Sequence, residues 1–319
     1  MEESRLDLVR YSPDFKKEWD DFVENSKNAT FLLKRDYMDY HAGRFHDNSY
    51  LVFYKGKLYS LLPANREGDT LYSHQGLTFG GLVMNEKTKA GTVVKIFEQI
   101  LKEMGKEDVR RLVYKPIPYI YHTLPSDEDL YALFRNGAKL TGRNIASVID
   151  RSHRPKFSRI RQTSLKKAVS AGYRVKETSD FATFWDILTE NLRSKYGALP
   201  VHSLEEMESL AARFPENIRL FAAYAGDKME GGVVCYISRN VVRTQYISAS
   251  DKGKSSGAID MIMNHLINRE FEGIRFFDLG SSNGDGGRYL NESLIYQKEG
   301  FGGRGVCYDE WEVHVESKE

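Results

Sequence analysis

The chain has 319 residues, of which 41% are hydrophobic and 29% are charged, and its formal net charge is +1 at pH 7. This composition is typical of a folded protein and excludes a polycation that binds nucleic acid through its overall charge, so electrostatic attraction must come from local patches. The two cysteines, Cys235 and Cys307, exclude a disulfide framework and a multi-cysteine zinc site. The sequence has no apolar run near the roughly 20 residues that cross a bilayer, and its charged N-terminus does not resemble a signal peptide. A cytoplasmic protein without membrane insertion is therefore expected.

The first half of the chain changes from a helical to an alternating pattern and back. Two helices are predicted at about 14–25 and 32–45, and three strands at 49–55, 57–64 and 69–74. A strongly amphipathic pattern at 93–104 predicts a helix that carries six apolar residues on one face. The predicted elements that follow are a strand at 110–116, a helix at about 127–136 and a strand at about 138–150.

The second half repeats this order. Its predicted helices lie at about 181–192, 204–214, 255–271 and 287–299. Its predicted strands lie at 172–176, 218–226, 229–238, 240–250, 274–280 and 304–315. Three meandering strands followed by a crossover helix and a further strand predict a mixed, mostly antiparallel sheet flanked by helices. The fold class expected is therefore α/β (α+β), with two domains at 1–152 and 153–319.

Four stretches of the second half carry a resemblance to a known family. They are the segment 151–176, with nine Lys/Arg and no acidic residue; the helix and loop 184–203; the hairpin 218–238; and the closing block 276–303, with Asp278-Leu-Gly280 and Gln297-Lys-Glu-Gly-Phe-Gly302. Together with the element order, they resemble the Fem-like branch of the GNAT acyltransferase superfamily, which includes the FemAB peptidoglycan-bridge aminoacyltransferases and related acetyltransferases. The resemblance implies two GNAT-like domains in tandem and an enzyme that transfers an acyl or aminoacyl group to an amine or hydroxyl.

The resemblance places the donor at the junction between the strand 240–250 and the helix that follows it. In GNAT enzymes this junction holds the pyrophosphate of acyl-CoA through backbone N–H groups and the helix dipole. The donor-binding residues expected from it are Ser248, Lys252, Lys254 and Gly257. The family's glycine-rich pattern is only partly matched, so a polar turn with Ser255 as the helix N-cap is an equal alternative.

Acceptor-binding residues are expected at three places. The lysine of the family's closing turn contacts the acceptor diphosphate, which implies this role for Lys298. Arg193 and Tyr196 lie three residues apart on one helix face, where Fem-like proteins bind the acceptor. His74 and Gly76 belong to YSHQGLTFGG in the first half, at the position of a Fem substrate loop whose usual proline is absent here. The alternatives are a surface lysine, a basic helix end and a solvated loop.

Acyl transfer also requires groups that move protons. His202 lies in a proline-containing loop and is a candidate general base. Asp278 ends a strand at the sheet edge where α/β ligands gather, and is a candidate to orient the acceptor amine or accept its proton. Tyr289 is a candidate proton donor to a departing thiolate. The alternatives are a solvated histidine, a turn-stabilising aspartate and a packed tyrosine. No nucleophile–base pair is evident, so direct attack without a covalent intermediate is expected.

Three functions are compatible with this pattern. The first is transfer from acyl-CoA (acetyl-CoA), as co-substrate, to a cell-envelope or sugar-nucleotide-type acceptor. The second uses an aminoacyl-tRNA donor, with the basic segment 151–176 along the tRNA backbone. The third is a non-catalytic binding module on a decayed GNAT fold. The eight histidines lack the spacing of metal ligands, so no metal is expected.

Overall fold

The computed structural model describes residues 6–315, which form two compact units. Unit 1 consists of Met1–Asn144, Gly284–Tyr289 and Cys307–Glu319, and unit 2 of Ile145–Asn283 and Leu290–Val306. Unit 1 thus takes segments from both predicted domains, 1–152 and 153–319, because the chain returns to it twice. Within residues 6–315, no helix is long and apolar enough to cross a membrane.

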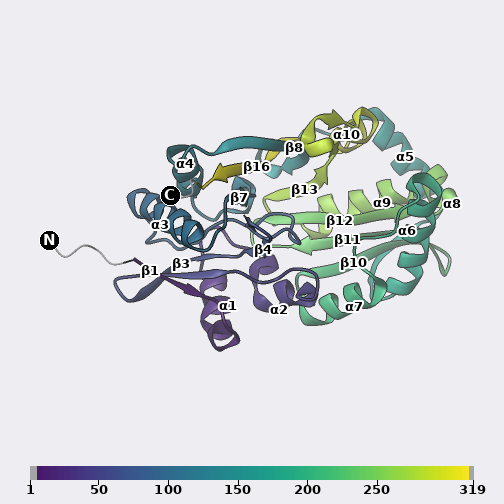
Figure 1. The fold of residues 1–319 in the computed structure, drawn as a ribbon. Helices are drawn as coiled ribbons and strands as arrows, with labels where there is room; N and C mark the ends of the chain where they lie inside the picture. The colour runs from purple at the N-terminus through teal and green to yellow at the C-terminus, as the bar shows by residue number, and fades with distance from the viewer. Residues whose placement is uncertain (1–5, 316–319) are drawn as a thin grey trace. The chain divides into compact units, whose positions relative to one another are not determined.

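Unit 1 contains four α-helices and two groups of strands (Figure 1). The helices are α1 (Lys16–Glu24), α2 (Arg35–Met38), α3 (Ala90–Lys106) and α4 (Glu128–Arg135). The strands β1 (Leu6–Arg10), β2 (Tyr50–Tyr54), β3 (Lys57–Leu62) and β6 (Val83–Met84) form one sheet in the order β1-β2-β3-β6. The strands β4 (Asn65–Glu67), β5 (Thr70–Tyr72), β7 (Arg111–Tyr114) and β16 (Arg304–His314) follow one another in a second sheet.

Two predictions for unit 1 are wrong in detail. The predicted meander is divided, because Pro63 lacks an N–H and follows the last residue of β3, so the next strands join the other sheet. The predicted helix 32–45 is interrupted at Lys34, whose backbone is extended. Side chains of α1 satisfy the interrupted backbone: Trp19 Nε1 donates to Leu33 O (2.8 Å) and Asp20 accepts from the Arg35 N–H (2.7 Å).

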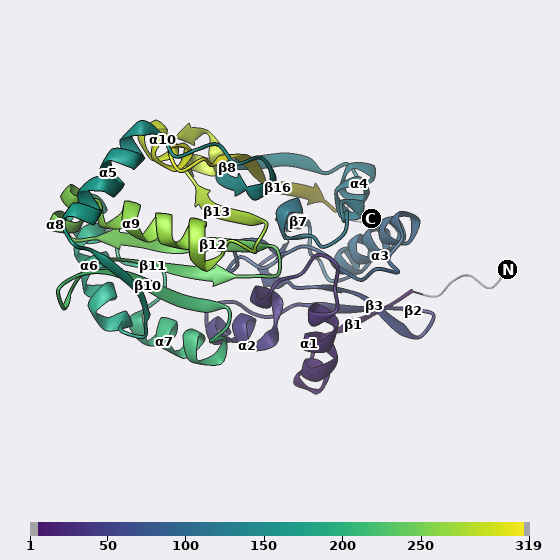
Figure 2. The same ribbon diagram turned by 180° about the vertical axis from the view of Figure 1, so that it is seen from behind.

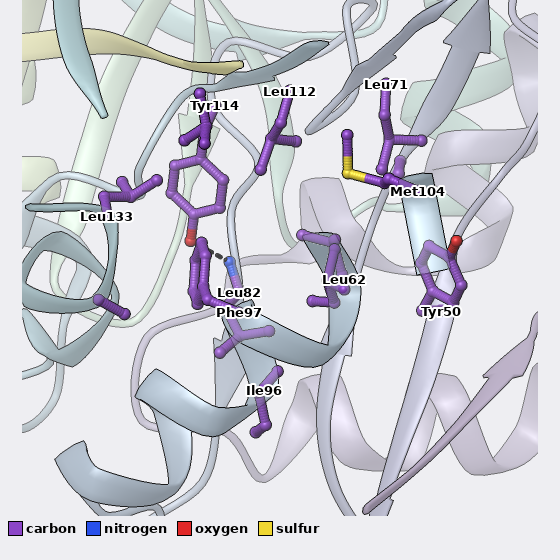
Figure 3. Packing of buried hydrophobic residues seen from close by; sticks show 14 of the residues in the cluster. Tyr50, Leu62, Leu71, Leu82, Ile96, Phe97, Met104, Leu112, Tyr114 and Leu133 are labelled. Carbon is purple, nitrogen blue, oxygen red and sulfur yellow. Dashed lines mark hydrogen bonds between the residues drawn. The ribbon is translucent and has the colours of Figure 1, made fainter. Parts of the chain in front are cut away.

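The core of unit 1 lies against the apolar face of α3, which confirms the helical periodicity seen in the sequence (Figure 3). Ile96 and Phe97 pack beside Leu62, Leu112 and Tyr114, all of them fully or almost fully buried. The Tyr114 hydroxyl accepts a hydrogen bond from the Leu82 N–H (2.6 Å), drawn as a dashed line in Figure 3.

Unit 2 contains a sheet in the order β8-β13-β12-β11-β10-β9. These strands are β8 (Lys139–Asp150), whose first residues belong to unit 1, β9 (Arg174–Thr178), β10 (Ile218–Ala225), β11 (Lys228–Ile237), β12 (Val241–Ala249) and β13 (Phe276–Ser281). The helices are α5 (Arg159–Ser170), α6 (Phe181–Tyr196), α7 (Leu204–Arg213), α8 (Asp251–Ser256), α9 (Ala258–His265) and α10 (Glu292–Glu299). The π-helical turn Leu266–Glu270 extends α9.

Helices cover both faces of this sheet (Figure 2). Phe221 and Val233 belong to the core cluster that contains the apolar residues of α9. A side chain at the neighbouring position Gly232 would instead overlap Phe184 of α6. Because successive residues of a strand face opposite sides, α9 and α6 lie on opposite faces.

Candidate functional site

The central feature of unit 2 is the separation of two parallel strands. β12 pairs with β13 only over Val241–Arg243 and Phe276–Asp278, so the rest of β12 lies beyond this ladder. The register of β12 against β11 also shifts at this point, which leaves Gln245 as the extra residue of a β-bulge. The backbone edge of β12 that faces β13 is therefore available to a ligand.

A cavity of about 660 Å³ opens beside this stretch of β12. Its floor includes Ile247, Ser248 and Ala249 of β12 and Leu279 of β13. Helices α5, α6, α8, α9 and α10 supply its walls. Its charged lining residues are Arg161, Lys195, Lys254, Lys298 and Asp260. Four cations against one carboxylate make this cavity attractive to an anionic ligand.

The predicted donor loop is folded as helix α8, and its N-cap is Ser250 rather than Ser255. The Ser250 hydroxyl accepts from the Gly253 N–H (3.0 Å) and donates to the buried carboxylate of Glu230. Lys252 lies 3.7 Å from the same carboxylate and does not line the cavity. An acidic side chain thus already occupies the N-terminal end of α8, where a phosphate was expected.

Both glycines of this region are required by packing. Gly257 has φ +84°, and a side chain there would overlap Ser164 O of α5. A side chain at Gly253 would overlap Glu230 O of β11 in the same way. Gly257 lines the cavity, but its need for glycine follows from the close approach of α5 and does not require a bound ligand.

Asn191 of α6 links two of the predicted donor residues. Its side-chain amide donates to Ser248 Oγ and to Ala249 O, both at 2.8 Å, and its carbonyl oxygen accepts from Lys254. Lys254 also pairs with Asp251 at 3.0 Å. Ser248 and Lys254 are therefore held on the cavity wall by one residue that the sequence did not single out.

Lys298 lies on the opposite wall, in α10. Its ammonium donates to Gly280 O (3.0 Å) and Ser281 O (2.6 Å) at the end of β13. Burial lowers the pKa of Lys298 to about 8; Asp278 opposes this shift and Arg243 adds to it. Asp278 is completely buried, where it accepts from Arg243 (2.9 Å) and from the Gly280 N–H (2.7 Å). Asp278 thus does not line the cavity itself, and it holds the Arg243 side chain and the end of β13 in place.

His202 is buried against Trp185 of α6 and Tyr246 of β12. Its Nδ1 lies 2.6 Å from the hydroxyl of Tyr246, and its carbonyl accepts from Trp185 Nε1 (3.3 Å). His202 is not among the residues that line the cavity. Tyr196 lies on the cavity wall with its ring mostly exposed, whereas Arg193 is exposed and outside the lining.

The remaining predicted residues lie in unit 1. Tyr289 is exposed. His74 is buried with φ +73° and its ring stacks on that of His41; burial, with nearby cations, lowers the pKa of His74 to about 3. A side chain at Gly76 would overlap His41 and Phe45. The loop that carries His74 and Gly76 is thus filled by side chains of its own unit.

The described residues that line the cavity include no cysteine. Cys235 lies in β11, completely buried, and burial raises its thiol pKa, so it does not form a reactive thiolate. The residues that the sequence did not identify are Asn191, Glu230 and Asp260, which pairs with Arg161 (3.0 Å). Arg161 was part of the recognised basic segment, but the other three stand alone in apolar or mixed patterns and carried no signal.

Residues 152–289 match the family described as "Acetyltransferase (GNAT) domain". The match includes β12, β13, α5, α6, α8 and α9, and therefore the whole cavity lining except Leu294, Gln297, Lys298 and Phe301. Residues 152–289, which make up most of unit 2, are therefore similar to a GNAT acetyltransferase domain.

Several solved structures resemble the fold of nearly the whole chain. The crystal structure of FemX is similar over 98% of each chain, with a TM-score of 0.68 and 10% sequence identity. L-PGS from Bacillus licheniformis covers 97% of this chain and 93% of its own, with a TM-score of 0.62 and 11% identity. A tandem GNAT protein from the clavulanic acid biosynthesis pathway covers 99% and 100%, with a TM-score of 0.51 and 12% identity. These likenesses confirm the predicted Fem-like tandem GNAT fold. No curated protein matches the chain in sequence.

Proposed function

We propose that unit 2 transfers an acyl group from acyl-CoA to an amine or hydroxyl of a cell-envelope or sugar-nucleotide-type acceptor. The observation that carries this proposal is the cationic cavity beside the separated strands β12 and β13. CoA is an anionic thioester carrier, so Arg161, Lys254 and Lys298 are suited to its phosphates. The GNAT match of residues 152–289 supports the same donor.

The proposed reaction is a direct substitution. The acceptor nitrogen or oxygen attacks the thioester carbonyl carbon, a C–N or C–O bond forms, and the C–S bond breaks to release the CoA thiolate. The proton of the acceptor leaves with the thiolate or with a base. Backbone N–H groups on the open edge of β12 are the candidates to stabilise the oxyanion, since this edge lies beyond the ladder with β13.

Lys298 has two proposed uses. As a cation it attracts an anionic part of donor or acceptor, and its pKa of about 8 allows a neutral fraction at mildly alkaline pH. His202, Asp278 and Tyr289 remain proposals for proton transfer. His202 is buried and would exchange a proton through the Tyr246 hydroxyl. Asp278 is buried against Arg243, whose guanidinium keeps its proton in proteins, so Asp278 would have to accept the proton from the acceptor directly.

Calorimetric titration with acetyl-CoA tests this proposal. Saturable binding that weakens with added salt is expected, with a matched titration of CoA lacking its acyl group to measure the contribution of the thioester. Absence of binding by acetyl-CoA and by longer acyl-CoAs would contradict it.

An aminoacyl-tRNA donor is the second candidate. Two observations favour it: α5 exposes Arg159, Lys166 and Lys167, and Ser164 of the same helix packs against Gly257 at the start of α9. A filter-binding measurement with charged and uncharged tRNA distinguishes this candidate. Binding of neither tRNA nor acyl-CoA would leave the third function, a non-catalytic binding module.

A further inference from the structure

The segment that follows Lys195 on the cavity wall exposes apolar side chains to solvent. Tyr196 is 61% exposed, Leu199 61% and Val201 78%. Monomeric proteins scatter single exposed apolar residues over their surface, but three within six positions form a local patch. This patch begins at the cavity, because Leu192, Ser194, Lys195 and Tyr196 line it.

The segment is held in this exposed arrangement at both ends. At its start, Gly197 takes the left-handed conformation (φ +62°) that ends α6, and its N–H donates to Arg193 O (3.0 Å). At its end, His202 is buried against Tyr246 and Trp185. The chain between these anchors projects Leu199 and Val201 outward, while Pro200 restricts its backbone.

The charge of the segment is of one sign. Its charged residues are Arg193 and Lys195, and the exposed Glu190 and Glu205 lie outside it, at either flank of 191–204. The Lys195 ammonium lies 5.0 Å from the centre of the Tyr196 ring. A second element of the same cavity, α5, also exposes cations together with Ile160 (54%) and Val169 (60%). Cations interleaved with protruding aromatic and aliphatic side chains are the composition of a surface that binds an anionic bilayer interface.

We propose that residues 193–201 dock unit 2 onto an anionic lipid surface, with Leu199 and Val201 entering the interface and Arg193 and Lys195 contacting lipid phosphates. The combination of lysine with exposed aliphatic side chains favours an anionic bilayer over a protein partner, because protein interfaces are depleted of lysine. Docking in this orientation brings the cavity mouth to the lipid surface. The consequence that the acceptor is carried by a lipid rests on the proposed transferase function, whereas docking itself does not.

Sedimentation of the full chain with vesicles tests docking without any acyl donor. Vesicles of phosphatidylcholine with phosphatidylglycerol are compared with vesicles of phosphatidylcholine alone. We expect binding to the anionic vesicles only, weakened by salt. The double variant Leu199→Ser, Val201→Ser is expected to lower the vesicle partition coefficient at least about tenfold. Phe134→Ser on α4, which removes a side chain that is 72% exposed, is the matched control and is expected to bind like the wild type.

A fluorescence measurement locates the contact. Leu199→Trp is expected to shift its emission to the blue on anionic vesicles and to be quenched by brominated lipids, whereas Phe134→Trp is expected to show neither effect. The proposal is overturned if the wild type stays in the supernatant with anionic vesicles, or if the serine double variant sediments as well as the wild type. Acetyl-CoA calorimetry on the same samples is independent, so a failure of docking and a failure of the transferase proposal are distinguishable.

Discussion

Unit 1 and unit 2 both place a helix between a short or bulged strand and the strand that follows: β6, α3 and β7 in unit 1, and β12, α8–α9 and β13 in unit 2. In unit 1, β6 and β7 belong to different sheets, and the Tyr114 side chain fills the space beside them. Its hydroxyl accepts from the Leu82 N–H and donates to Asp129 of α4 (2.6 Å). In unit 2, the space beside the separated strands is the cationic cavity.

This difference shows that separated strands alone do not make a binding site. In unit 1 the backbone donor at Leu82 is satisfied by a phenol from the same core, and the cluster around it is apolar. In unit 2 the corresponding space is lined by Lys254 and Lys298, whose ammonium groups are bound by neighbouring oxygen atoms and keep the space cationic. The comparison indicates a structural role for the space between β6 and β7 in unit 1, and it supports the proposed binding role of the space between β12 and β13 in unit 2.

The largest effect is expected from removing the Tyr114 side chain, which fills the space beside β6 and β7. Tyr114→Ala should lower the free energy of unfolding by about 3–5 kcal/mol, because it leaves a cavity and deprives Leu82 and Asp129 of their partner. Urea unfolding followed by circular dichroism measures it. Tyr131→Ala on the exposed face of α4 is the control and should change the value by less than about 0.5 kcal/mol. Equal costs for the two variants would contradict the structural role of Tyr114.

The second effect is a pH dependence of the free energy of unfolding, caused by Asp129 of unit 1. Burial raises the pKa of Asp129 to about 7, and the hydrogen bond from Tyr114 opposes the shift. The folded state therefore keeps a proton that the unfolded chain releases near pH 4, so the free energy of unfolding should fall as pH rises from about 4 to 7 and then level off. The expected loss is on the order of 2–4 kcal/mol.

Asp129→Asn isolates this contribution, because the amide does not titrate. Urea unfolding at several pH values should show a shallower slope for Asp129→Asn than for the wild type. Asp127→Asn, at an exposed position two residues away, should retain the slope of the wild type. An unchanged slope in Asp129→Asn would show that this carboxyl ionises freely in the folded chain.

The third effect concerns the cavity of unit 2. Lys298→Met should weaken acetyl-CoA binding about tenfold, because it removes a half-buried cation but keeps the apolar stem. The lysine pKa of about 8 also predicts that wild-type affinity falls as pH rises above about 8, when Lys298 loses its charge, and that the variant lacks this decline. Calorimetry across this pH range measures both. Lys176→Met on β9 is the control; the assignment fails if the two lysine variants behave alike.

The smallest expected effect is a difference in acetyl-CoA affinity between variants of two lysines of α8. Lys254→Gln should weaken acetyl-CoA binding about threefold, since its side chain is half exposed and already bound to Asn191 and Asp251. Lys252→Gln should leave the affinity unchanged, because Lys252 is directed to Glu230 and away from the cavity. Calorimetric titration of both variants tests the pair, and a larger loss with Lys252→Gln would reverse the assignment.

Local patterns in the sequence determined most elements of this fold. The apolar face of α3, the amphipathic helix of the sequence, packs as its spacing predicts. The turn at Lys55-Gly56 joins β2 and β3 with positive φ at both residues, as a tight hairpin requires. These features depend on residues within a few positions of one another, which is why a single sequence reveals them.

The binding site required the tertiary structure. The sequence placed Ser248, Lys254, Gly257, Tyr196 and Lys298 near one donor or acceptor, and the structure brings these five to one cavity. The sequence alone could not show that Lys254 lines the cavity and Lys252 does not, and it could not identify Asn191 and Glu230. Each of these distinctions depends on which side chain approaches from a distant strand or helix. The sequence also could not show that Tyr114 fills the space beside β6 and β7, whereas the space beside β12 and β13 is a cavity. Spacing along the chain determines helices, strands and turns. Burial, and the hydrogen bonds that polar groups make to distant partners, decide which pair of separated strands has a cavity beside it.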